Sequence, residues 1–74
     1  MLYDYSKLTG RIIEKFGSRA AFARSAGTTL HSVSKKLNNA AKLSQDDIFL
    51  WSELLEIDDA DIRAYFFTPR SQSA

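Results

Sequence analysis

Residues 18–39 read SRAAFARSAGTTLHSVSKKLNN, and this stretch decides the fold. Ser18 and Thr29 are of the residue types that cap helix N-termini, and Gly27 is suited to end a helix in a left-handed conformation. Two helices are therefore expected, separated by little more than a glycine and one or two threonines. A connection that short prevents an antiparallel pair and forces a steep crossing, as in a helix-turn-helix.

The second of these helices is expected to have two unlike faces. Val33 and Leu37 fall at helical spacing and are predicted to point inward, against the alanine-rich helix that precedes them. Serine, lysine, histidine and asparagine occupy an outward face, and no acidic residue occurs between Arg19 and Lys42. Such side chains can donate hydrogen bonds to base edges in a major groove or to phosphates, whereas a carboxylate would be repelled by phosphate. This face is a candidate nucleic-acid interface.

The net charge of +1 conceals a division along the chain. Residues 1–43 contain eight lysines and arginines and two acidic residues, a net of +6. Residues 44–74 contain two arginines and seven acidic residues, a net of −5. This division predicts a basic surface that attracts polyanions and an acidic one that repels them, although chance clustering on solvated faces would give the same totals.

Five short helices are predicted, and no segment has the pattern of a strand. The expected segments are residues 4–16, 18–26 and 29–38, one from residue 44, and one from residue 58 or 59. Ser44 and Asp47 have the spacing of a capping box, and the last helix is expected to end before Pro69. Gly10 lies inside the first helix, where we expect it to allow close approach of another helix. Taken together, these segments predict a compact all-α domain over residues 1–67 and a disordered polar tail over residues 68–74.

Several kinds of protein are not expected from this composition. With 74 residues the chain forms one domain, which can bury a modest core but not also a deep substrate cleft. There is no cysteine, and the lone His31 has no acidic residue near it in sequence to complete a metal site. We therefore expect no enzymatic activity, cofactor, metal or small-molecule substrate. No apolar run has transmembrane length and the N-terminus lacks signal-peptide form, so we expect a cytoplasmic protein.

The string RAAFARSAGTTLHSVSKKLNN resembles the helix-turn-helix of lambda-repressor-like phage regulators. Ala23 precedes the turn glycine by four positions, Thr29 occupies the cap, and Val33 follows the glycine by six. The flanking strings YDYSKLTGRIIEKFG, KLNN and YFF are similar to Cro-like regulators of temperate phages of Gram-positive bacteria, a group that includes modulators of repression. The resemblance covers residues 2–67, nearly the whole chain.

This resemblance implies a five-helix lambda-repressor-like DNA-binding domain that acts in the lysis–lysogeny switch, in the cytoplasm of a bacterial host cell. Two functions stay open. The first is a Cro-like transcriptional repressor that binds double-stranded operator DNA as a homodimer. The second is a modulator of repression, or antirepressor, that forms a complex with the phage's CI-type repressor.

Two sets of residues would meet DNA in the first of these functions. The recognition helix would present Thr29, Leu30, His31, Ser34 and Lys35. Phosphates would be contacted by Ser18, Arg19, Asn38, Asn39 and Lys42. Arg19 stands at a helix N-terminus, where a cation opposes the dipole, so an anionic partner is expected for it. Leu30 stands where many relatives carry a polar base-reader, and Lys36 where they commonly carry a core aliphatic residue.

Three consecutive aromatic residues, Tyr65, Phe66 and Phe67, close the last predicted helix. They cannot all face inward from one helix end. At least one is therefore expected to be exposed or buried in a partner. We consider the three a candidate partner interface, used either for self-association or for binding the repressor.

Overall fold

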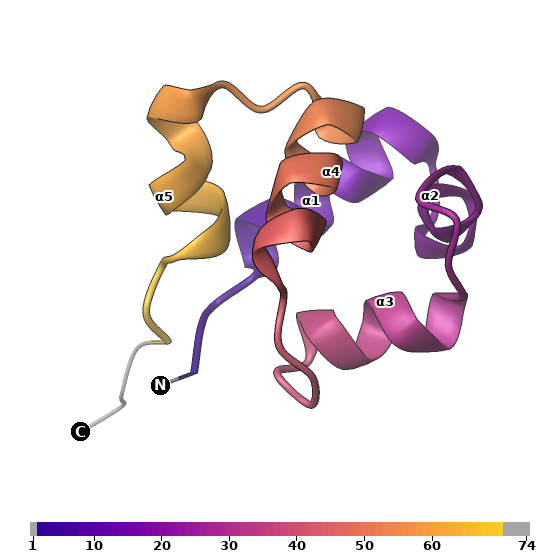
Figure 1. Ribbon diagram of the computed structural model, residues 1–74, viewed down its shortest axis with the longest axis horizontal. Helices are drawn as coiled ribbons and strands as arrows, with labels where there is room; N and C mark the ends of the chain where they lie inside the picture. The colour runs from indigo at the N-terminus through magenta and orange to yellow at the C-terminus, as the bar shows by residue number, and fades with distance from the viewer. Residues whose placement is uncertain (1, 71–74) are drawn as a thin grey trace.

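The computed structural model describes residues 2–70, which form five α-helices and one short 3₁₀ helix (Figure 1). They are α1 (Ser6–Phe16), α2 (Arg19–Ser25), α3 (Leu30–Leu37), α4 (Gln45–Leu55), η1 (Asp59–Asp61) and α5 (Ile62–Phe66). Within these residues the only extended pairing is an isolated antiparallel bridge between Tyr3 and Pro69. The predicted all-α fold is confirmed.

The predicted helix starts are formed by side-chain caps. The N–H of Ala21 donates to Ser18 Oγ at the start of α2, and the N–H of Ser32 donates to Thr29 Oγ1 at the start of α3 (3.1 Å each). At α4 the capping box is complete, because Ser44 Oγ accepts from the N–H of Asp47 and Asp47 Oδ2 accepts from the N–H of Ser44. Each cap satisfies a backbone donor that the helix itself leaves free.

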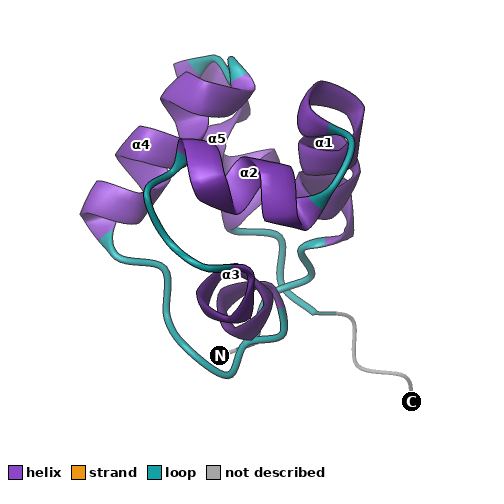
Figure 2. Cartoon of the chain, turned by 90° about the vertical axis from the view of Figure 1, so that its right-hand side faces the viewer, coloured by secondary structure: helices purple, strands orange, loops and turns teal. Residues whose placement is uncertain are grey.

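Two glycines fix the turns on either side of α2. Gly17 follows α1 with φ of +83°, and Gly27 follows α2 with φ of +72°, as predicted for Gly27. The short connection makes α2 and α3 cross steeply: Figure 1 shows α2 end-on and α3 lengthwise, and Figure 2 shows the reverse. The expected close approach at Gly10 is wrong, because no atom beyond its chain neighbours and the backbone of its own helix lies within 4 Å of where its Cβ would stand.

A single core lies between the helices. Its buried members are Tyr5, Leu8, Ile12, Phe22, Ala23, Val33, Leu37, Trp51, Leu55, Ile57 and Phe66. Phe22 packs edge-on against Trp51, with ring centroids 4.9 Å apart, and so joins α2 to α4. Val33 and Leu37 are buried, as the helical spacing predicted, which fixes which face of α3 remains outside.

The two ends of the described chain lie side by side. The N–H of Asp4 donates to the carbonyl of Thr68 (2.8 Å), and the N–H of Arg70 donates to the carbonyl of Leu2 (3.0 Å). The tail expected to begin at residue 68 therefore starts with three residues that are paired with the N-terminal segment. Residues 71–74 of that expected tail lie outside the described residues. None of the helices within residues 2–70 has the length and apolar character that crossing a membrane requires.

Candidate functional site

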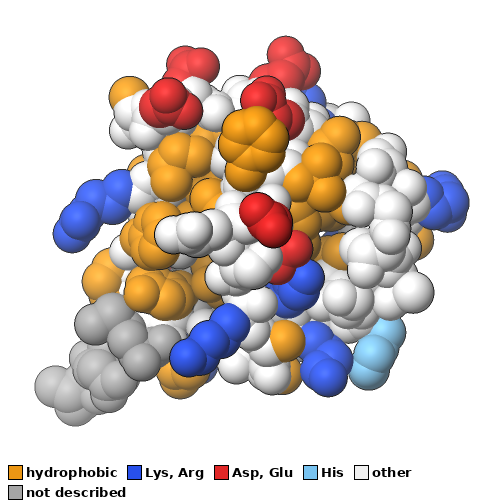
Figure 3. All heavy atoms as spheres, in the orientation of Figure 1, with side chains coloured by type: hydrophobic (Ala, Val, Ile, Leu, Met, Phe, Trp, Pro, Cys, Tyr) orange, Lys and Arg blue, Asp and Glu red, His pale blue; other side chains and the backbone are white. Residues whose placement is uncertain are grey.

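The outward face of α3 carries most of the predicted recognition residues. Thr29, Leu30, His31 and Lys35 are exposed, and Ser34 is half-buried. In Figure 3 the histidine and several basic side chains lie along the lower edge, where Figure 1 shows α3, while acidic side chains gather at the upper edge. Basic side chains thus predominate at the lower edge of this face, although acidic side chains also lie near its middle.

Leu30 is an apolar residue on this otherwise polar face. Its side chain is 48% exposed, so it is not part of the core. A large aliphatic side chain left in water suits contact with another apolar surface better than contact with phosphate. This position distinguishes the chain's outward face from a purely polar DNA-reading face.

The expected phosphate contacts are spread over two segments. Ser18 is exposed, but its hydroxyl already caps α2. Arg19 is half-buried and forms no ion pair within residues 2–70, so the structure supplies no anionic partner for it. Asn38 and Lys42 are exposed on the segment that follows α3.

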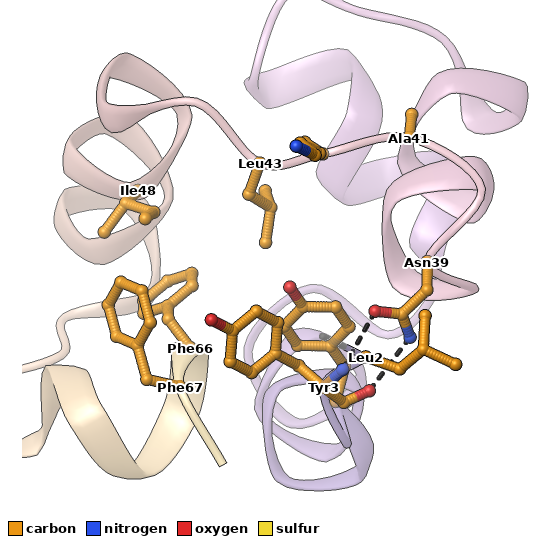
Figure 4. Close-up of a pocket in the computed structure, with 10 residues that line it drawn as sticks. Leu2, Tyr3, Asn39, Ala41, Leu43, Ile48, Phe66 and Phe67 are labelled. Carbon is orange, nitrogen blue, oxygen red and sulfur yellow. Dashed lines mark hydrogen bonds between the residues drawn. The ribbon is translucent and has the colours of Figure 1, made fainter. Parts of the chain in front are cut away.

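Asn39 has a structural role that the sequence did not predict. Its Oδ1 accepts from the N–H of Tyr3 (3.0 Å), and its Nδ2 donates to the carbonyl of Tyr3 (2.9 Å), as Figure 4 shows. The residue also adopts a left-handed conformation, with φ of +64°, which asparagine tolerates. The amide therefore holds the N-terminal segment through its oxygen and one of its two N–H groups.

The three C-terminal aromatics separate into different environments. Phe66, expected in the partner interface, is 1% exposed and belongs to the core, so it offers a partner very little surface. Tyr65 is half-buried, and Lys7 Nζ lies 4.8 Å from its ring centroid. Phe67 is 39% exposed and meets the ring of Tyr3 edge-on at 5.9 Å. Phe67 is the one of the three that a partner reaches most directly.

Phe67 stands at one side of an aromatic hollow of about 510 Å³ (Figure 4). The residues that line it are Leu2, Tyr3, Tyr5, Asn39, Ala41, Lys42, Leu43, Ile48, Phe66 and Phe67. In Figure 4, Leu43 extends from the segment before α4 toward the rings at the opposite wall. An open hollow with apolar walls and tyrosine hydroxyls has the chemistry of a protein-binding surface, where aromatic residues are enriched.

Sequence reasoning did not find the N-terminal half of this hollow. Tyr3, Tyr5 and Leu2 come from the first residues of the chain, and Leu43 comes from the segment that leads to α4. The sequence feature that could have indicated this part of the hollow is the pair of closely spaced tyrosines, Tyr3 and Tyr5. Burial raises the pKa of Tyr5, with a smaller contribution from Tyr3.

A largely buried ion pair joins α3 to α4. Lys36 Nζ lies 2.9 Å from Asp47 Oδ2, and the two side chains are 19% and 23% exposed. Partial burial acts to raise the pKa of Asp47, but hydrogen bonds from Lys36 and from the Ser44 backbone, with the charge of Lys36, outweigh it and hold the pKa below its ordinary value. This pair explains a lysine at a position where an aliphatic residue was expected, and it removes Lys36 from the free basic surface.

Two of three comparisons with known proteins found matches, and the third found none. One solved structure that matches is the solution structure of the modulator of repression (MOR) of the temperate bacteriophage TP901-1 from Lactococcus lactis. The two chains are 39% identical, the match covers 97% of each, and the TM-score is 0.80. A search of curated proteins found no match. Residues 1–69 match the family described as "Protein of unknown function (DUF739)", and the chain belongs to that family.

Proposed function

We propose that this chain is a non-enzymatic regulator of a temperate phage, acting in the lysis–lysogeny choice by binding a CI-type repressor protein. The observation that carries the proposal is the 39% identity over 97% of both chains to a phage protein named a modulator of repression. A match that spans both chains end to end relates whole molecules rather than a shared motif. The repressor, rather than operator DNA, is therefore the partner we favour.

The aromatic hollow supports a protein partner. Leu2 is 47% exposed and Phe67 is 39% exposed at its edge, so apolar surface is presented to solvent beside the rings that line it. Aromatic anchors that enter or receive such pockets account for much of the binding energy in protein interfaces. A polyanion would gain little from this surface, which has Lys42 as its one charged lining residue among those described.

The test is calorimetric titration of the purified chain with the repressor encoded by the same phage. Phe67→Ser should weaken binding about tenfold or more, because it removes an exposed aromatic anchor. Ile13→Ser is the matched control, since Ile13 is 45% exposed on α1 and does not line the hollow. No binding by the folded wild-type chain would refute the repressor as partner. Equal affinities of the two variants would refute the hollow as the binding surface.

Direct DNA binding is the second candidate function. It is favoured by the steep crossing of α2 and α3, by the exposure of Thr29, His31 and Lys35, and by the absence of acidic residues between Arg19 and Lys42. A helix-turn-helix chain of this size would pair on half-sites about 34 Å apart, so this function also requires a homodimer on DNA.

Replacing His31, Ser34 and Lys35 together with alanine separates this candidate from the first. Such surface changes usually cost no more than about 0.5 kcal/mol of stability, so the chain should stay folded. Val33→Ala is the contrasting change, because it empties part of the core and should cost about 2 kcal/mol. Loss of operator binding in the folded triple variant, with repressor binding intact, would favour the DNA-reading function.

A further inference from the structure

A second apolar surface lies on α4, and neither proposed function uses it. Ile48, Phe49, Ile57 and Ile62 provide the apolar lining of a groove of about 280 Å³ between α4 and the segment through η1 to α5. Phe49 is 68% exposed, the largest exposure of any large hydrophobic side chain within residues 2–70. The groove shares only Ile48 with the aromatic hollow, so the two surfaces can be tested separately.

Acidic side chains surround Phe49. Asp46 and Glu53 lie three residues before it and four after it on α4, so they flank it on the same helical face. Asp59 lines the groove from the opposite side. These carboxylates belong to an exposed set that forms no ion pair within the described part of the chain: Asp46, Glu53, Asp58, Asp59 and Asp61.

We propose that this acidic groove binds a short basic segment of another protein, which places one large apolar side chain against Phe49 and lysines or arginines beside the carboxylates. Charge complementarity selects this occupant. A nucleic acid would be repelled by the carboxylates, and an uncharged apolar segment would leave them without partners. The proposal does not depend on the repressor or on operator DNA, so it gives the molecule a second binding surface.

A second copy of this chain is the competing occupant. The outward face of α3 on that copy resembles the proposed basic segment. It carries an apolar side chain, Leu30, which is 48% exposed, together with the exposed side chains of His31 and Lys35. A contact of that kind would join different surfaces on successive copies and would build rings or open assemblies instead of a two-fold dimer. For this reason we assign the groove to a different protein.

The test uses the full ¹⁵N-labelled chain and a synthetic amphipathic peptide of leucine and lysine. Amide shifts should concentrate on Phe49, Glu53 and Asp59, and affinity should fall with added salt. Phe49→Ser should weaken binding about tenfold or more. Leu50→Ser, which changes a neighbouring exposed apolar residue that does not line the groove, should bind as the wild type does.

Four results would overturn the proposal, three of them from the peptide titration. A matched peptide of leucine and glutamate could bind equally well, Phe49→Ser could bind the lysine peptide as tightly as the wild type, or the shifts could concentrate on Tyr3 and Phe67. A further contrary result is sedimentation that shows self-association dependent on Phe49, since a second copy would then occupy the groove. The titration contains no repressor, so its outcome is independent of the proposed function. Unchanged amide spectra away from the groove would show that each variant is folded.

Discussion

Adjacent residues of the same type perform different tasks in this chain. Asn38 is exposed with φ of −94°, while Asn39 is half-buried with φ of +64° and holds Tyr3 through two hydrogen bonds. The sequence placed both asparagines in one set of phosphate contacts, because residue type alone does not reveal a partner that lies 36 positions away. Only the structure shows that Asn38 is exposed and that Asn39 is hydrogen-bonded to Tyr3.

Asn39→Ala should lower the free energy of unfolding by about 2 kcal/mol. Two hydrogen bonds of roughly 1 kcal/mol each are lost, and alanine is disfavoured in a left-handed conformation. Urea denaturation measures the change, with Asn38→Ala as the control that should differ little from the wild type. Equal stability of the two variants would show that Asn39 does not secure the N-terminal segment.

The Lys36–Asp47 pair should make stability depend on pH. Because the pKa of Asp47 in the folded chain lies below its ordinary value of 3.8, its stabilising effect is complete above about pH 4 and is lost as the pH falls through the lowered pKa. Asp47→Asn should therefore cost about 1 kcal/mol near pH 7 and progressively less in acid. Denaturation midpoints of both proteins between neutral and acidic pH measure this, and a difference that is constant with pH would contradict it.

At the scale of elements, helix boundaries follow local chemistry. Ser18, Thr29 and Ser44 each cap the helix that was predicted to follow them, because a cap depends only on the next three residues. The first helix begins at Ser6 and not near residue 4; Asp4 stands before it and accepts the N–H of Ser6 at 2.8 Å.

Gly10→Ala should stabilise the chain by about 0.5–1 kcal/mol. Gly10 lies within α1, and a methyl group there would meet no atom within 4 Å beyond its chain neighbours and the backbone of its own helix, so alanine gains helix propensity without a clash. Gly17→Ala is the contrasting change and should destabilise by about 1 kcal/mol or more, because φ there is +83°. Thermal unfolding compares the two, and destabilisation by Gly10→Ala would show a constraint on α1 that the packing does not reveal.

The candidate site was only partly predictable because its parts come from distant segments. The outward face of α3 could be predicted, since Val33 and Leu37 define the buried side by helical spacing alone. The aromatic hollow could not, because it assembles the N-terminal segment, the loop after α3, α4 and the end of α5. The role of Lys36 was missed for the same reason, since its partner Asp47 lies on another helix.

At the scale of the whole molecule, two kinds of surface coexist on one small core. The side that carries α3 is basic, and the acidic residues follow Ser44 in the sequence, on α4, η1 and the loop between them. The aromatic hollow is built from both ends of the chain, which are held side by side by backbone hydrogen bonds. Such an arrangement suits a regulator that meets other proteins on more than one side.

A gel-shift experiment tests most directly whether the chain acts on the repressor and not on DNA. Operator DNA from the phage's own switch region is mixed with the chain alone, with the repressor alone, and with both proteins. We expect the chain alone to leave the DNA unshifted and to change the mobility or the amount of the repressor–DNA complex. Retardation of operator DNA by the chain alone, weakened by salt with a log–log slope of about −0.9 per phosphate contacted, and no effect on the repressor complex, would contradict the account.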